Sequence, residues 1–293
     1  YNTVYALAGP GDEVIIPAPY WVSYPEQVRA VGATPVIVQT SAEEDFKMSA
    51  AALRAAITER TRLLILISPS NPTGSVYSRS ELEALAEVLV EKQVPVLSDE
   101  VYDELVYGEP FTSIASLGSE VYDLTVIIGA ASKTYAMTGW RIGCAVGPAD
   151  VIAAAGRLQR HSTSGANSAA QKATIAAVTG DQSTVEVMRQ EFDRRRRYML
   201  GRLNAMPGVS CPEPKGAFYT FPKVSAYYGR SFGGPPIDTS LDFCATLLQE
   251  AKLAVIPGGA FGADGHVRLS YAVSMQEIEE ALNRLEWFLS KLE

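Results

Sequence analysis

The chain has 293 residues, of which 47% are hydrophobic, and a formal net charge of -8. This length and apolar content suffice for a substantial core and favour two domains. The acidic charge disfavours a nucleic-acid partner, and no apolar stretch is long enough to span a membrane. The three scattered cysteines and two histidines predict no metal site. With no signal peptide opening the chain, we expect a cytoplasmic protein.

The first half of the chain, from residue 14 to about 147, alternates short β-rich runs with helical stretches. This alternation predicts an α/β fold, with a mostly parallel sheet and helices on both faces. The spacing of the apolar residues predicts a helix from Ser80 to Lys92. An apolar segment places Cys144 in a strand, where we expect it in the core. The clearest strand candidates are residues 63–67, 94–98 and 124–128.

The second half begins with a long charged helix, expected from Ser183 to Met206. Its four consecutive arginines, 194–197, point around most of the helix, which is typical of a solvated face. A closing helix is expected from Met275 to Leu292. The strand-like segments between the two helices are residues 217–221, 253–256 and 267–270. We therefore expect a large cofactor-binding domain over residues 1–182, and an interdomain helix with a smaller α+β domain over residues 183–293.

Lys133 is the most informative residue for chemistry. It stands just past the apolar run 124–128, and open α/β sheets bind ligands beyond the carboxyl ends of their strands. The amine of a partly desolvated lysine can condense with an aldehyde to form a Schiff base. An isolated lysine at a strand end is more often simply solvated. The surrounding residues therefore decide between the two interpretations.

Two earlier strands end in groups with matching chemistry: Asn71 after the first, and Asp99 with Tyr102 after the second. An acid can keep a pyridine nitrogen protonated, and an amide and a hydroxyl can both donate to a phenolate oxygen. Arg141, eight residues after Lys133, offers a permanently charged guanidinium suited to a phosphate. Singly, these residues are better explained as a turn former, a helix cap and a core tyrosine. Their succession at three strand ends favours a pyridoxal phosphate site.

The sequence resembles the fold-type I pyridoxal-phosphate aminotransferases of class I/II, in the aspartate aminotransferase family. Within that family it is most similar to the bacterial and archaeal subgroup of aspartate and prephenate aminotransferases. The resemblance extends over nearly the whole chain. The phrases that carry it are PYWVSYP at 19–25, NPTG at 71–74, SDEVY at 98–102, SK at 132–133, GWRIG at 139–143 and VRLSY at 267–271.

The resemblance implies a role for each of the residues already named. Lys133 is the Schiff-base lysine and the proton shuttle, and Asp99 faces the ring nitrogen of the cofactor. Tyr102 and Asn71 hold the phenolate oxygen, and Arg141 holds the phosphate. Lys133, Asp99 and Tyr102 are thus the implied catalytic residues.

The resemblance also implies roles for Trp21 and Arg268. Trp21 stacks on the cofactor ring, as suits a large flat side chain beside a π-system. Arg268 grips the α-carboxylate of the substrate in a bidentate pair, and Asn71 and Trp21 line the same pocket. A strand arginine in a surface ion pair is the alternative for Arg268, and its place in the matched phrase disfavours it.

The implied reaction is pyridoxal-phosphate-dependent transamination between an L-amino acid, here aspartate, and a 2-oxo acid, here 2-oxoglutarate. Prephenate or aromatic amino acids are the alternative substrates, because Arg268 does not read the side chain. The family also implies a homodimer with shared active sites. The match begins part-way through the family's large domain, so we expect about a quarter of a family-length chain to precede Tyr1. We accordingly expect residues 1–293 alone to bind the cofactor poorly and to show little activity.

Two rival interpretations belong to other classes of protein. Residues 229–233 match the G-x-S-x-G nucleophile elbow around Ser231, and Asp242 and His266 follow in hydrolase order. The elbow requires a helix directly after the serine, whereas Gly-Pro-Pro at 234–236 predicts a loop. The second rival is a transcriptional regulator with an aminotransferase-like domain that senses pyridoxal phosphate. The acidic charge and the phrases around Trp21 and Arg268 favour the enzyme.

Overall fold

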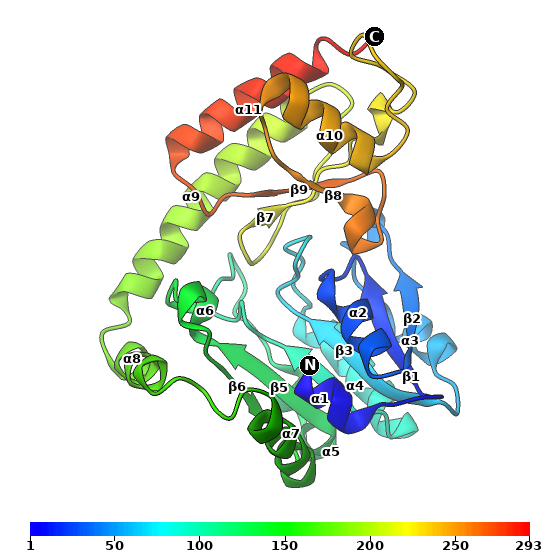
Figure 1. The fold of residues 1–293 in the computed structure, drawn as a ribbon, viewed down its shortest axis with the longest axis vertical. Coiled ribbons are helices and arrows are strands. Elements are labelled where there is room, and N and C mark those ends of the chain that lie inside the picture. Colours follow the sequence, from blue (N-terminus) through cyan, green and yellow to red (C-terminus); the bar gives the residue numbers. More distant parts are fainter.

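In the computed structural model, which describes residues 1–293, the chain forms two sheets, each with its own helices (Figure 1). The larger sheet has six strands in the order β2-β1-β3-β4-β5-β6. All neighbours in it are parallel except β5 and β6, so the predicted mostly parallel sheet is confirmed. Its strands are β1 (Glu13–Ala18), β2 (Thr34–Gln39), β3 (Thr61–Ile67), β4 (Val96–Asp99), β5 (Thr125–Ala130) and β6 (Gly143–Val146).

Helices cover both faces of this sheet, as predicted. Side chains alternate between the faces of a strand, so Ile15 of β1 joins the core under α3 and α4. Its neighbours Val14 and Ile16 join the core under α1 and α2. These helices are α1 (Asn2–Leu7), α2 (Ser23–Ala30), α3 (Ala50–Ala56) and α4 (Arg79–Lys92). We call this assembly, with the helices α5 (Ser119–Leu124), α6 (Ala131–Thr134), α7 (Ala149–Ser162) and α8 (Ser168–Thr179), the large-sheet unit.

Capping explains the observed start of α4. The helix was expected from Ser80, and it begins one residue earlier because Ser78 caps it. The Ser78 hydroxyl accepts a hydrogen bond from the Glu81 N–H, while the Glu81 carboxylate accepts one from the Ser78 N–H. The predicted Lys92 end is observed.

The prediction that Cys144 is a core residue is wrong. Cys144 lies in β6, whose four residues are all exposed. β6 is the last strand of the sheet and pairs only with β5, and no residue of the following helix α7 is buried. The apolar composition of this segment predicts a strand, but it does not distinguish an edge strand from a central one.

The smaller sheet is antiparallel, with strand order β7-β9-β8. Its strands, β7 (Tyr219–Thr220), β8 (Ile256–Pro257) and β9 (Val267–Ser270), overlap the predicted segments. Helices α9 (Ser183–Ala205), α10 (Ser240–Ala251) and α11 (Met275–Leu289) share one hydrophobic core with it. We call this assembly the small-sheet unit. Figure 1 shows α9 running from beside α8 of the large-sheet unit to α11 of the small-sheet unit.

The arginine run of α9 differs from the solvated face that was predicted. Arg197 is exposed, whereas Arg196 is buried. The guanidinium of Arg196 pairs with Asp193 and Glu213 and donates to the carbonyl oxygen of Pro214 at 3.0 Å. Glu213 and Pro214 come from the loop that follows the helix, so the sequence of the helix alone does not reveal them.

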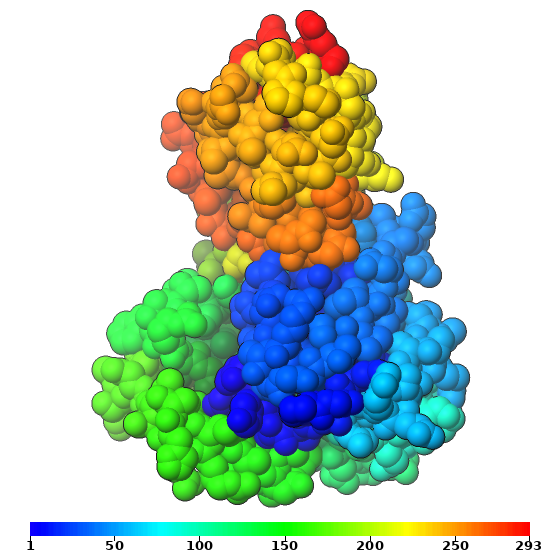
Figure 2. Space-filling view, turned by 45° about the vertical axis from the view of Figure 1, so that its right-hand side comes forward, coloured from blue at the N-terminus to red at the C-terminus, as the bar shows by residue number.

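The two units meet where the segment around residues 255–270 touches the first 45 residues, orange against blue in Figure 2. Here the N–H of Tyr20 donates to the Phe261 carbonyl oxygen at 3.1 Å. Position 262 requires a glycine, because a Cβ there would lie 2.8 Å from the Tyr20 ring.

None of the helices has the combination of length and hydropathy that crossing a membrane requires.

Candidate active site

Three adjacent parallel strands bring the predicted site residues to one edge of the large sheet. Asp99 is the last residue of β4, and Asn71 lies in the turn that follows β3. Lys133 lies in α6, the short helix directly after β5. Since β3, β4 and β5 are neighbours, their carboxyl ends lie side by side. This edge is where α/β sheets place their ligands.

Lys133 is half-buried beside aromatic rings. Its Nζ lies 5.7 Å from the centre of the Tyr102 ring and 5.5 Å from that of Phe218. Burial lowers the pKa of the amine, and the positive charges of Arg141 and Arg268 lower it further. A lowered pKa favours the neutral amine, which is the form that acts as a nucleophile or a base.

Asp99 is a buried carboxylate with two donors. The Tyr24 hydroxyl donates to its Oδ2, and the Val101 N–H donates to its Oδ1 at 3.3 Å. Burial raises the pKa of Asp99, and these two hydrogen bonds oppose that effect. The ring of Tyr24 also meets Trp21 edge-on, at 5.3 Å between ring centres. Trp21 is 37% exposed, so part of its side chain is accessible to a ligand.

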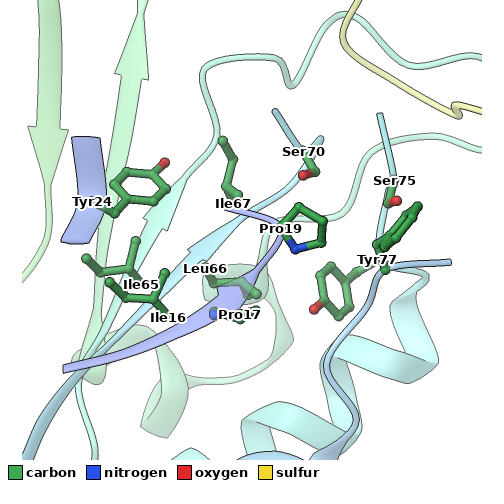
Figure 3. Close-up of a pocket in the computed structure, with 11 residues that line it drawn as sticks. Ile16, Pro17, Pro19, Tyr24, Ile65, Leu66, Ile67, Ser70, Ser75 and Tyr77 are labelled. Carbon is green, nitrogen blue, oxygen red and sulfur yellow. The ribbon is translucent and has the colours of Figure 1, made fainter. Parts of the chain in front are cut away.

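Close packing fixes this part of the site. Figure 3 shows Tyr24 alongside Ile16 and Ile65, and Pro19 beside Ser70 of the turn that carries Asn71. The cavity that these side chains enclose measures only about 20 Å³, room for about one water molecule. Tyr24 and the turn therefore line a space too small for anything larger than a water molecule.

The small-sheet unit contributes the remaining polar groups. Tyr219 of β7 shares a hydrogen bond of 2.8 Å with the buried hydroxyl of Tyr102. Arg268 of β9 donates from Nη1 to Oδ1 of Asn71 at 2.8 Å, which leaves the amide Nδ2 to donate to a ligand. The Arg268 guanidinium also lies 4.5 Å from the centre of the Tyr219 ring. Tyr219 thus joins Tyr102 to Arg268, and Arg268 in turn contacts Asn71.

Arg141 is an exposed residue of the predicted site. It follows a short 3-10 turn, Thr138–Trp140, and adopts the left-handed conformation, with φ of 52°. Its Nη1 donates to the Thr138 carbonyl oxygen at 2.8 Å. The guanidinium is close enough to Lys133 to lower the pKa of the amine, which places a fixed positive charge at the rim of the site.

The donor set fits pyridoxal phosphate. A buried acid, Asp99, matches the pyridine nitrogen, and an amine of lowered pKa, Lys133, matches the aldehyde. The Asn71 amide and Tyr102 hydroxyl match the phenolate oxygen, and the exposed Arg141 matches the phosphate.

Two residues of this site escaped the sequence analysis, Tyr24 and Tyr219. Tyr24 lies within the matched phrase 19–25, and Tyr219 lies within the predicted strand 217–221. What identifies them is their hydrogen bonds to Asp99 and Tyr102.

The hydrolase motif does not form a site. Ser231 lies in an irregular loop between Tyr228 and α10, without the strand and helix that the elbow requires. Asp242 caps α10 by accepting hydrogen bonds from Thr239. The ring of His266 stacks on Phe221, at 5.0 Å between ring centres. The structure therefore contradicts this rival.

Comparison with known proteins agrees with the geometry. The family model "Aminotransferase class I and II" matches residues 2–285. The aspartate aminotransferase of Streptomyces avermitilis is 45% identical over 292 residues, 99% of this chain and 72% of that protein. The aspartate/prephenate aminotransferase of Cereibacter sphaeroides is also 45% identical, covering 100% of this chain and 74% of that protein. The crystal structure of the Rhizobium meliloti aspartate aminotransferase superimposes with a TM-score of 0.96 at 42% identity, covering 100% of this chain and 74% of that one.

Proposed function

Because the chain belongs to the class I and II aminotransferase family and is an aminotransferase, we propose that it transfers the amino group of aspartate to 2-oxoglutarate with pyridoxal phosphate. The observation that carries this proposal is that Lys133 and Asp99 lie at the carboxyl edge of the large sheet, where Arg268 of the small sheet contacts Asn71. When bound, pyridoxal phosphate supplies an acceptor for the electrons released at the substrate Cα.

The chain's own residues would hold that cofactor. We assign Asp99 to the ring nitrogen, Asn71 and Tyr102 to the phenolate oxygen and Arg141 to the phosphate. Trp21 covers one face of the ring. The hydrogen bond from Tyr24 supports this assignment, because it helps to keep Asp99 ionised despite burial.

Lys133 is the residue that we propose to move the proton. Burial and the charges of the two arginines lower the pKa of its amine, while Asp99 opposes them, and the neutral amine can take a proton from the substrate Cα. Arg268 binds the α-carboxylate and thereby fixes the Cα within reach of the amine. The Asn71 oxygen that Arg268 contacts helps to orient the guanidinium.

The first experiment replaces Lys133 with alanine in the natural full-length protein. We expect transamination to fall by at least about 10³-fold, as general base catalysis contributes on this order. Cofactor binding should persist, because the other contacts remain. Borohydride reduction of the wild-type enzyme, followed by peptide mass spectrometry, should find the pyridoxal group on Lys133. Attachment to another lysine, or normal turnover by Lys133→Ala, would contradict the assignment; Lys291→Ala, at an exposed position, is the control.

Aspartate is the substrate that the named relatives favour, and prephenate is the alternative that one of them suggests. A panel of amino acids and oxo acids, compared by kcat/KM, separates the two. We expect the highest kcat/KM with aspartate and 2-oxoglutarate. An aromatic amino acid or prephenate turned over far faster than the dicarboxylates would reject aspartate.

We also propose a homodimer in the cytoplasm, with residues 1–182 binding the cofactor and residues 183–293 closing over the substrate. Large apolar side chains exposed on the large-sheet unit support the dimer, among them Trp140, Ile175 and Val178. Light scattering should give twice the monomer mass. A monomer that retains full activity would reject the shared site.

A further inference from the structure

We propose that Tyr219 is a positioning residue that serves two groups of the site at once: its hydroxyl orients Tyr102, and its ring supports Arg268. The inference rests on the proposed function, because the roles of Tyr102 and Arg268 come from it. Tyr219 belongs to the small-sheet unit and is buried, whereas Tyr102 follows β4 of the large-sheet unit. It therefore links the two units inside the site.

The hydroxyl of Tyr219 determines the direction in which Tyr102 donates. The two hydroxyls share a 2.8 Å hydrogen bond, and burial raises the pKa of both phenols, so each keeps its proton. A hydroxyl has one proton to give. If Tyr102 donates to the phenolate oxygen of the cofactor, the proton of the shared bond must come from Tyr219. Donation from Tyr219 also makes Tyr102 the stronger donor, because hydrogen bonds in a chain polarise one another.

The ring of Tyr219 supports the guanidinium of Arg268. The guanidinium carbon lies 4.5 Å from the centre of this ring and 5.1 Å from that of Phe261. The Asn71 oxygen completes the contacts at 2.8 Å. These three partners are neutral, so they hold the cation in place while its charge remains available to a substrate carboxylate.

Strand pairing explains why one residue reaches both groups. β7 and β9 are antiparallel, with Tyr219 opposite Ser270, so Arg268 stands diagonally across from Tyr219 on the neighbouring strand. Long and aromatic side chains in that diagonal relation are within reach of each other. The ring of Tyr219 therefore lies against Arg268 while its hydroxyl extends to Tyr102.

Two variants separate the two roles. Tyr219→Phe removes the hydroxyl and keeps the ring. We expect it to raise the pH midpoint of the absorbance change of the bound cofactor by about half a unit, since a neutral hydrogen bond is worth about that much. KM for the amino acid should stay within about twofold of wild type. Tyr219→Leu removes the ring as well, and we expect it to raise KM for both the amino acid and the oxo acid by roughly three- to tenfold.

A double-mutant cycle tests whether the hydroxyl acts through Tyr102. In a Tyr102→Phe background, Tyr219→Phe should cause no further spectral shift, because its partner is gone. Tyr227→Phe is the matched control: it also removes a buried tyrosine hydroxyl of the small-sheet unit, one that donates to the Pro207 carbonyl, and it should leave the spectrum unchanged. An unchanged pH midpoint in Tyr219→Phe, or an equal shift in the two backgrounds, would overturn the hydroxyl role. An unchanged KM in a folded Tyr219→Leu would overturn the ring role.

The wild-type enzyme distinguishes this inference from the proposed function. If wild type lacks transamination or a pyridoxal group on Lys133, the proposed function itself fails. If wild type has both and the Tyr219 variants behave like wild type, only the role of Tyr219 fails. Tm measurements on each variant show whether it is folded at the assay temperature.

Discussion

At the scale of single residues, burial and hydrogen bonding act against each other on Asp99. Burial disfavours its charged form, and the donors Tyr24 and Val101 favour it. An acid that must stay ionised to face a pyridinium nitrogen depends on such donors. Burial also raises the pKa of Tyr24 well above its ordinary value, so Tyr24 remains a donor at every physiological pH.

Replacing Tyr24 with phenylalanine should make cofactor binding sensitive to pH. Without this donor the pKa of Asp99 rises further, so the carboxylate becomes protonated at a higher pH than in wild type. We expect the Kd for pyridoxal phosphate to rise about tenfold near pH 6, the loss expected for a hydrogen bond to a charged group, and less at pH 8. Absorbance titrations across this range measure the effect. Tyr5→Phe, at an exposed site, is the control, and coincident curves of Kd against pH for Tyr24→Phe and wild type would reject the role.

The residue scale also shows where sequence analysis succeeds and where it stops. Asn71, Asp99 and Lys133 can be predicted as neighbours because each directly follows an apolar strand, and parallel strands end at one edge. Tyr24 and Tyr219 cannot, because their hydroxyl partners lie 75 and 117 residues away along the chain. No local pattern encodes a pairing at that separation.

At the scale of elements, helix α9 is connected to the turn that carries Asn71. Arg196 holds the loop of Glu213 and Pro214 against the helix. The next residues of that loop, 215 and 216, both donate backbone hydrogen bonds of 2.8 Å to the Gly74 carbonyl. Gly74 lies so close to the loop that a Cβ would stand 2.4 Å from the side chain of Pro214, which accounts for glycine there.

Replacing Arg196 with methionine should destabilise the protein by about 2–3 kcal/mol. The variant leaves Asp193, which is largely buried, with only the exposed Arg197 as a cationic partner, and it removes the donor to the Pro214 carbonyl oxygen; poorly compensated buried groups are costly. The loss in free energy of unfolding should be smaller than for a fully buried ion pair, because Glu213 is mostly exposed. Denaturant unfolding measures the difference. Arg197→Met is the matched control on the exposed side of the same helix, with an expected change within about 0.5 kcal/mol; equal losses in the two variants would contradict the prediction.

The same helix shows the limit of periodicity. The charged sequence predicts α9 to within one residue of its observed end. The run of four arginines, however, occupies every side of the helix, so the pattern does not say which one is buried. That is decided by a loop 17 residues further along, at Glu213.

At the scale of the whole molecule, an aromatic contact joins the two units beside the site. Phe46 of the large-sheet unit meets Phe221 edge-on at 5.7 Å, and His266 of the small-sheet unit lies against both rings. The α/β class and the second, smaller sheet follow from the order of strands and helices in the sequence. The contact does not, because Phe46 and Phe221 come from opposite halves of the chain and no local pattern encodes their pairing.

His266 should make the stability of this contact depend on pH. Burial lowers the pKa of its imidazole below the ordinary value near 6.5, and the positive charge of Lys223 lowers it further, while the carboxylate of Asp264 opposes them. His266 in the unfolded chain therefore binds a proton more readily than in the folded one. The stabilising contribution of its neutral imidazole is fully present above about pH 6.5, and it is lost as the pH falls through the folded pKa.

We accordingly expect the Tm of the wild type to fall more steeply than that of His266→Asn as the pH falls from 8 to 5.5, because asparagine does not titrate. The difference between the two curves isolates the imidazole from the carboxylates that titrate in both proteins. His161, the only other histidine, is exposed on α7, and His161→Asn should keep the steep wild-type dependence. Parallel curves for wild type and His266→Asn would show that the contact does not sense protonation. A steeper curve for the variant would reverse the sign and require a partner that stabilises the charged ring.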